Sequence, residues 1–162
     1  MALTPDFDTY PVEFALSSVE IYSTHIEVGW SDGRVSRFHH SWLRDNCPCA
    51  QCVHQITKEQ MFELVTVSAD VHPTGAGIDP EGALALTWSE AGHPNEIHHS
   101  QIHPGWLRAN CYGDEARRER RNGQITWDAS TFDAPPTFDG AAIIADDSAL
   151  LDWLNSLHSY GV

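Results

Sequence analysis

The chain has 162 residues, of which 41% are hydrophobic and 20% charged, a composition typical of a globular protein and unlike a wholly disordered one. No window approaches the roughly eighteen consecutive apolar residues of a membrane-spanning helix, and the acidic N-terminus lacks a signal-peptide pattern. Nine Lys and Arg against 23 Asp and Glu give a formal net charge of −14, which disfavours binding to nucleic acids and anionic membranes.

The first expected elements form an antiparallel meander. Apolar and polar residues alternate along residues 18–22, 24–30 and 35–39, which is the period of half-buried strands. The sequence Ser31-Asp32-Gly33 has the composition of a turn between the last two. A loop with three cysteines follows this meander. Further along the chain we expect strands at residues 62–68, 83–88 and 96–102, with a turn-rich stretch at residues 72–82.

The hydrophobic period changes after Pro104. Residues 105–111 and 114–121 are expected to form short helices, and residues 131–140, which include two adjacent prolines, are expected to form an exposed linker. Asp147 and Ser148 offer an N-cap for a last helix. That helix carries an apolar stripe of leucines and one tryptophan and ends at Gly161.

The expected fold class is mostly β. We predict a small antiparallel β domain over residues 1–127, a linker over residues 128–145, and a C-terminal helix over residues 146–162. The broad apolar face of that helix has no following segment in the chain to pack against. We therefore expect the chain to be the front part of a longer protein, although a helix that folds back on the β domain is the alternative.

Three cysteines lie within six residues, as Cys47, Cys49 and Cys52. A disulfide between the first two would be strained, and clustered thiols in a reducing cytoplasm, where we place the chain, more often hold a metal ion. Zinc bound by thiolates takes four ligands in a tetrahedron, and imidazole commonly completes the set. Unligated thiols, or an iron–sulfur cluster that also recruits Cys111, are the alternatives.

The fourth ligand is ambiguous from the residues alone, because the chain has ten histidines. His54 is so close to Cys52 that its coordination would be strained. The other candidates are His93, His98, His99 and His103. On a strand over residues 96–102, His98 shares a face with Ser100 and His99 points to the other face.

Residues 42–52 closely resemble the zinc-site segment of the γ-butyrobetaine and trimethyllysine dioxygenase family. Similarity continues through Leu86-Thr87-Trp88 and through a His-x-Ser step that precedes Trp106-Leu107. The family places its zinc histidine eight residues before that Trp-Leu pair. The resemblance thus implies a structural zinc site. Its ligands would be Cys47, Cys49, Cys52 and His98. A longer loop before His98 in this chain keeps His93 as a rival.

The resemblance also implies a function for the complete protein. Members of this family are oxidoreductases of carnitine biosynthesis, which hydroxylate a trimethylammonium substrate such as γ-butyrobetaine with iron(II), O2 and 2-oxoglutarate. The catalytic double-stranded β-helix domain is absent from this chain, so we expect no catalytic or cofactor-binding residues here. Its expected partners are that catalytic domain and, in the full-length protein, a second copy in a homodimer. The alternative is a free-standing zinc-binding scaffold, linked to iron–sulfur assembly.

One His-x-Glu step, His25-Ile26-Glu27, has the spacing with which non-haem oxygenases bind iron. Alternating surface strands produce the same spacing, and this step precedes the cysteines within the zinc domain. We therefore expect an ordinary strand surface at this position.

Overall fold

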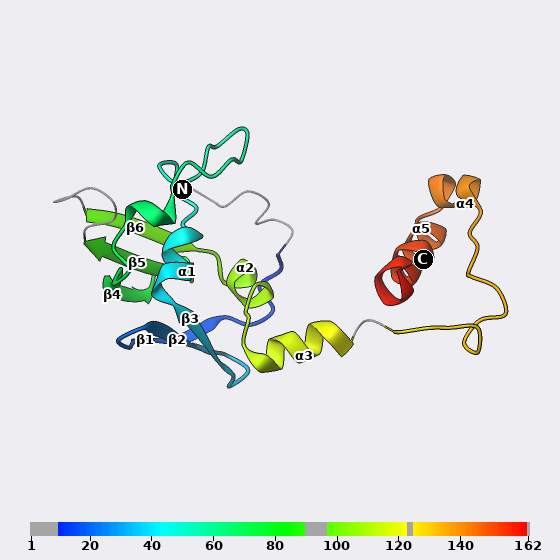
Figure 1. Cartoon of the computed structure of the whole chain (residues 1–162), viewed down its shortest axis with the longest axis horizontal. Coiled ribbons are helices and arrows are strands. Elements are labelled where there is room, and N and C mark those ends of the chain that lie inside the picture. Colours follow the sequence, from blue (N-terminus) through cyan, green and yellow to red (C-terminus); the bar gives the residue numbers. More distant parts are fainter. Residues whose placement is uncertain (1–9, 90–96, 123–124, 162) are drawn as a thin grey trace. The chain divides into compact units, whose positions relative to one another are not determined.

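The computed structural model describes residues 10–89, 97–122 and 125–161 (Figure 1). The chain divides into two compact units, Met1–Gly113 and Asp114–Val162. Among the described residues, the first unit contains two three-stranded antiparallel sheets, two short α-helices and one 3-10 helix, and the second contains three α-helices.

The first sheet is the expected meander. Strands β1 (Leu16–Ile21), β2 (His25–Trp30) and β3 (Val35–His39) pair in the order β1-β2-β3. Ile26, Val28 and Trp30 alternate along β2 and are buried, because successive side chains of a strand face opposite sides of the sheet. Gly33 turns the chain between β2 and β3 with a φ of +84°, a left-handed conformation that glycine adopts without strain.

The second sheet consists of β4 (Pro73–Ile78), β5 (Leu84–Ser89) and β6 (Ile97–Ile102), in the order β4-β5-β6. Strands β5 and β6 confirm the prediction. The prediction of turns over residues 72–82 was wrong, because β4 occupies most of that range. The sequence of β4, PTGAGI, is poor in strand-forming residues, but β4 is an edge strand. Pro73 is its first residue, where the missing N–H costs no hydrogen bond of the ladder.

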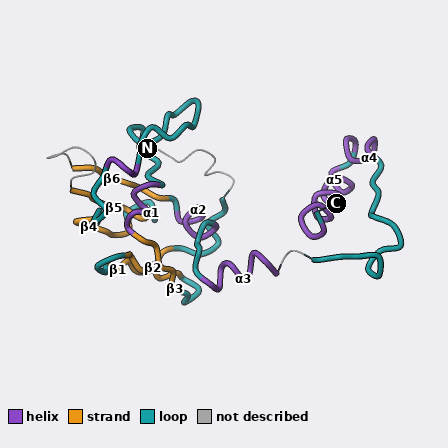
Figure 2. The backbone as a smooth tube through the Cα atoms, viewed as in Figure 1, coloured by secondary structure: helices purple, strands orange, loops and turns teal. Residues whose placement is uncertain are grey.

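The prediction of a strand at residues 62–68 was also wrong. Figure 2 shows the segment between the first helix and β4 mainly as loop, with one 3-10 helix, η2 (Leu64–Thr66). Val65 within it is 89% exposed. The alternation of apolar residues there does not reflect a buried face, since Phe62 instead packs on the guanidinium of Arg44.

Two short helices flank the second sheet in the sequence. Helix α1 (His40–Asp45) directly follows β3, where we had expected only a loop, and α2 (Pro104–Ala109) follows β6 as predicted. Leu43 of α1 and Leu107 of α2 are fully buried. Together with the buried residues of both sheets they form the core. Its largest members are Trp30, Trp88, Phe38, Ile26, Leu84, Leu86 and Ile102.

The second unit contains α3 (Asp114–Asn122), α4 (Gly140–Ala145) and α5 (Asp147–Tyr160). The last helix is the predicted one, and it ends at Gly161, whose φ is +75°. Its N-cap is Asp146, one residue before the predicted cap residues. The Asp146 carboxylate accepts a hydrogen bond from the Ala149 backbone N–H at 3.1 Å. Helix α4 lies within the range that we expected to be linker.

The predicted fold class, a small and mostly β domain with short helices, is confirmed. Among the helices of the described residues, none combines the length and the apolar character needed to cross a bilayer.

Candidate metal centre

A tight turn after α1 brings the three cysteines together. The N–H of Cys47 donates to the Arg44 carbonyl at 3.3 Å, so the chain leaves the helix in a further turn. The N–H groups of Cys52 and Val53 then both donate to the Cys49 carbonyl, at 2.9 and 3.0 Å. This fold-back lets three sulfurs that are close in sequence converge on one point.

The chain after Cys52 is held against the same turn. Val53 and Gln60 form an isolated antiparallel bridge, and the N–H of Met61 donates to the Cys52 carbonyl at 2.8 Å. The Gln60 amide also donates to the Asp45 carboxylate at 2.9 Å, which ties this loop to the end of α1. The cysteine turn is therefore anchored by backbone bonds on both sides.

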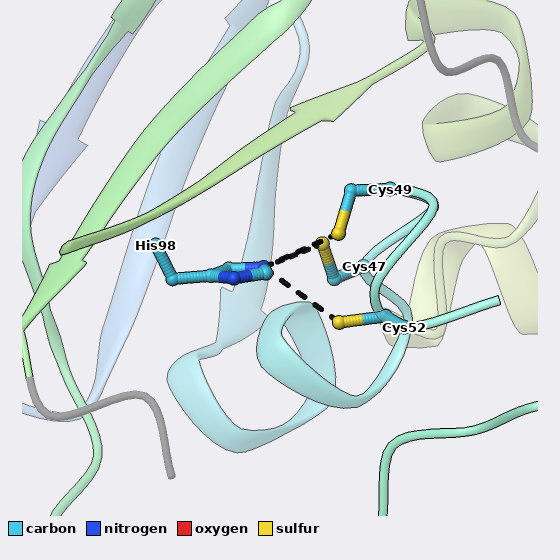
Figure 3. A group of neighbouring side chains, drawn as sticks. All are labelled: Cys47, Cys49, Cys52 and His98. Carbon is cyan, nitrogen blue, oxygen red and sulfur yellow. Dashed lines mark hydrogen bonds between the residues drawn. The ribbon is translucent and has the colours of Figure 1, made fainter. Parts of the chain in front are cut away.

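The fourth side chain comes from the second sheet. His98 lies on β6 opposite Trp88 of β5 and is 8% exposed. Figure 3 shows its ring directed at the three sulfurs. Its Nε2 lies 3.1 Å from Sγ of Cys47 and 3.6 Å from Sγ of both Cys49 and Cys52. The structure thus brings together the four residues that the family resemblance combines.

The donor set has the dimensions of a tetrahedral metal site. All four ligand atoms lie within 4.8 Å of one another. An ion with Zn–S bonds of about 2.3 Å and Zn–N bonds of about 2.0 Å separates its tetrahedral ligands by roughly 3.5–3.8 Å. Small side-chain movements bring the cluster to that spacing. Three thiols and one imidazole also match the soft and borderline ligands that zinc prefers, so the residues fit a zinc ion.

Hydrogen bonds within the cluster shift the proton affinities of its side chains in different directions. Hydrogen bonds from Cys47 and Cys52 hold the pKa of Cys49 well below its ordinary value, whereas hydrogen bonds to the other two thiols and burial raise the pKa of Cys47. Hydrogen bonds with Cys49 and Cys52 raise the pKa of His98 to about 9, although burial and the Arg44 charge oppose this. A divalent cation competes with protons for the same lone pairs.

Three other candidate histidines lie outside the cluster. The Nδ1 of His54 accepts from the Thr57 backbone at 3.1 Å, and the His103 side chain caps α2 by accepting from the Trp106 backbone at 3.4 Å. His99 is exposed on the opposite face of β6, where its Nδ1 lies 3.3 Å from Thr87 Oγ1. The rival His93 lies outside the described residues.

The His25 and Glu27 side chains lie side by side on β2, with His25 Nε2 3.6 Å from Glu27 Oε1. Within the described part of the chain, the cysteine cluster is the one group of three or more His, Cys, Asp or Glu side chains placed to hold a metal ion. The structure therefore gives the His25 and Glu27 pair no third ligand among the described residues.

Two further residues act on the cluster, Arg44 and Ser100, and neither was assigned a role there from the sequence. The Arg44 side chain is 2% exposed and its Nη1 donates to Cys52 Sγ at 3.2 Å. The buried Ser100 hydroxyl lowers the pKa of the Cys47 thiol against the larger effects that raise it. Strand alternation already placed Ser100 on the His98 face of its strand, whereas the Arg44 contact depends on how α1 is oriented.

One side of the cluster is open. Cys49 is the partly exposed member, and it lines an open cavity of about 340 Å³ together with Leu86, Thr87 and His99. Cys47 and Cys52 are 0% and 2% exposed. Solvent therefore reaches the cluster from the Cys49 side.

The fold and the site together define a small β domain built around a Cys3His cluster suited to binding a metal ion. Residues 18–98 match the family described as Gamma-butyrobetaine hydroxylase-like, N-terminal, and the chain belongs to that family.

Relatives of the chain are named as dioxygenases. It is 36% identical to the γ-butyrobetaine dioxygenase of Pseudomonas sp. (strain AK-1) over 160 residues, which are 97% of this chain and 40% of that protein. It is 29% identical to the trimethyllysine dioxygenase of Neurospora crassa over 74% of this chain and 24% of that protein. The human γ-butyrobetaine dioxygenase is 24% identical over 85% of this chain and 34% of the relative. The chain thus spans less than half the length of these relatives.

Proposed function

We propose that this chain is the zinc-binding N-terminal domain of an oxygenase that hydroxylates a trimethylammonium substrate such as γ-butyrobetaine in carnitine biosynthesis. The observation that carries the proposal is the convergence of Cys47, Cys49, Cys52 and His98 in a chain that matches an N-terminal domain family and 40% or less of the length of related dioxygenases. Zinc is proposed as the ion because three thiolates and one imidazole form its common structural ligand set.

The proposed role of the ion is structural. Four protein ligands close a tetrahedral zinc shell, which leaves no open position for water or substrate, and bound zinc would supply folding free energy and no redox chemistry. The cluster joins the turn after α1 to β6, two parts of the domain that are far apart in sequence. We infer that Cys47, Cys49, Cys52 and His98 hold these two parts together.

The oxygenase chemistry is proposed for the complete protein. It would use iron(II), O2 and 2-oxoglutarate and would release succinate and CO2. Iron centres of this type use two histidines and a carboxylate, and His25 and Glu27 have no third ligand among the described residues. The proposal therefore assigns catalysis to a further domain and metal-dependent support to this one.

We propose that the catalytic domain is also the partner of the second unit. Helix α5 keeps an apolar face, with Leu151 57%, Leu154 44% and Leu157 45% exposed. An apolar helix face of this kind is typical of a surface that is covered in a larger assembly. The homodimer expected for the full-length protein is likewise a proposal, and light scattering on that protein tests it.

We propose a cytoplasmic location, because all four cysteines are free thiols in the structure. Free, metal-binding thiols are typical of reducing compartments.

The test uses the complete reading frame that contains this chain. We expect its product to hold one tightly bound zinc and to turn over 2-oxoglutarate with γ-butyrobetaine or trimethyllysine when iron(II) is supplied. The 162-residue chain should hold zinc but release no succinate above a metal-only control. A reading frame that ends at Val162 would instead favour the free-standing scaffold. A longer product that turns over neither substrate would refute the proposed oxygenase activity.

A further inference from the structure

With a divalent cation bound, the cysteine cluster would carry a negative charge that a nearby positive group has to balance. Three thiolates and a neutral imidazole around a divalent cation carry a net charge of −1. Cys47 is 0%, Cys52 2% and His98 8% exposed, so water solvates this charge poorly on most sides. A buried charge is costly unless a group of opposite sign lies beside it.

Arg44 is placed to provide that group. Its side chain is 2% exposed, and Nη1 lies 3.2 Å from Cys52 Sγ within hydrogen-bonding distance. A guanidinium stays protonated at any accessible pH, so its positive charge is permanent. A charge-assisted hydrogen bond to a thiolate stabilises the anionic form that binds metal, because the donor interacts more strongly with S⁻ than with SH.

The surroundings hold this guanidinium in position. Arg44 lies in the last turn of α1, three residues before Cys47 in the chain, and its Cζ lies 3.7 Å from the centre of the Phe62 ring. A planar cation stacks on such a ring face, an interaction that strengthens when water is excluded. The ring comes from the loop after the cysteine turn, so segments on both sides of the cysteines position one positive charge.

We propose that Arg44 is the counter-charge of the metal centre, and that its guanidinium balances the thiolate shell and thereby sets the affinity for a divalent cation. Arg44 is a positioning residue and not a ligand, since it acts on the ion through Cys52. The inference rests on the proposed metal site, and it assigns to Arg44 an effect on metal affinity beyond its effect on folding.

A second arginine of the same unit provides a matched control. Arg108 also lies near aromatic rings, 5.0 Å from those of Phe14 and Trp30, and its Nη2 lies 2.6 Å from the Asp32 carboxylate. Its partner is a carboxylate and not a sulfur. Arg108→Gln therefore removes a stabilising arginine without removing charge from the cluster.

The experiment compares Arg44→Gln, Arg44→Lys and Arg108→Gln in the 162-residue chain. Zinc affinity is measured by competition with a chromophoric chelator, and the sulfur-to-metal charge-transfer band is recorded after cobalt(II) substitution. Glutamine keeps an N–H donor without the charge, and we expect it to weaken zinc binding by roughly 10–100-fold, as other outer partners of metal ligands do. The cobalt band should move to lower energy, because the sulfur electrons lose a neighbouring positive charge.

Arg44→Lys keeps the charge without the planar fork, so we expect zinc affinity within roughly threefold of wild type and an unshifted band. Arg108→Gln should leave both measurements at wild-type values. An Arg44→Gln chain with wild-type affinity and band would overturn the proposal. Should that variant fail to fold, Arg44→Lys decides, since a loss as large as 100-fold would show that packing and not charge is responsible. A wild-type chain that binds no metal would instead refute the proposed function.

Discussion

Trp88 Nε1 donates a hydrogen bond of 2.9 Å to Ser100 Oγ on the neighbouring strand. The same serine lowers the pKa of the Cys47 thiol, and its side chain is buried on the face of β6 that carries His98. The first sheet repeats the arrangement, because Trp30 Nε1 donates to Ser36 Oγ at 2.9 Å and Cys111 Sγ lies 3.4 Å from that oxygen. Within the part of the chain that the structure describes, the Cys111 thiol of this arrangement belongs to no metal-binding cluster.

These matched pairs predict different results for two serine substitutions. Ser100→Ala and Ser36→Ala each leave a buried indole N–H without its acceptor, so each should lower the free energy of unfolding by about 1–3 kcal/mol. Only Ser100→Ala should also weaken zinc binding, because only Ser100 lowers the pKa of a cluster thiol and so favours its metal-binding anionic form. Denaturant unfolding and chelator competition measure the two effects separately. Equal losses of zinc affinity in both variants would refute a specific role of Ser100.

Histidine substitutions test the fourth ligand. His98→Ala should weaken zinc binding by more than about 100-fold, beyond the loss typical of an outer partner, because it removes a donor atom. His99→Ala should have no measurable effect, since that ring lies on the exposed face of the strand. His93→Ala is predicted to be equally silent. Zinc-to-protein ratios after dialysis against a chelator provide the measurement, and full zinc retention by His98→Ala would contradict the assignment.

Thiol alkylation should proceed in a defined order in the metal-free chain. Cys49 is partly exposed and its pKa is lowered by hydrogen bonds from Cys47 and Cys52, so it should react roughly tenfold or more faster than the other thiols. Cys111, which is 5% exposed, provides an internal reference outside the cluster. A short iodoacetamide pulse followed by peptide mass spectrometry gives the order. Faster modification of Cys47 would show that the open side of the cluster is misassigned.

The buried His40 side chain should make the free energy of unfolding depend on pH. Burial lowers its pKa below the ordinary 6.5, with smaller contributions from the charges of His72, His25 and His39. The unfolded chain therefore takes up a proton at a higher pH than the folded chain does. The stability that comes from neutral His40 is complete above pH 6.5 and decreases as the pH falls below that value.

The comparison of wild type with His40→Gln isolates this contribution, because the metal ligands titrate in both proteins. Between about pH 7 and about pH 5, the unfolding free energy of wild type should fall more steeply than that of His40→Gln. Chemical denaturation at several pH values measures both slopes. Parallel slopes would show that the imidazole is not neutral in the folded state.

The cysteine cluster was predictable from local spacing, but its histidine was not. Cys47, Cys49 and Cys52 lie within one turn after α1, whereas His98 reaches them from the second sheet. Only the resemblance to a family selected His98 among several candidates. Alternation along β6 placed His98 and Ser100 on one face, which the burial of both side chains bears out. Arg44 was missed because its contact with Cys52 depends on how α1 is oriented.

The strand predictions were correct where alternating apolar side chains mark a buried face. They were wrong where the presence or absence of a partner strand determines whether a strand forms. The buried alternation of β2 and β5 is visible in the sequence. Strand β4 has little propensity of its own and forms because β5 offers a partner. Residues 62–68 have the reverse character, with strand-like composition but no place in either sheet, and Phe62 covers Arg44 instead.

The cluster spans 46 residues between Cys52 and His98, so an ion bound there would close a ring of chain that contains β4, β5 and η2. Closing a ring restricts the unfolded chain, and the entropic penalty grows only with the logarithm of ring length, by about 0.6 kcal/mol for each doubling. Insertions within this ring would therefore cost little stability while the ion stays bound. We therefore expect this fold to tolerate length changes in the loops between the cysteines and the histidine better than changes in the spacing among the cysteines themselves.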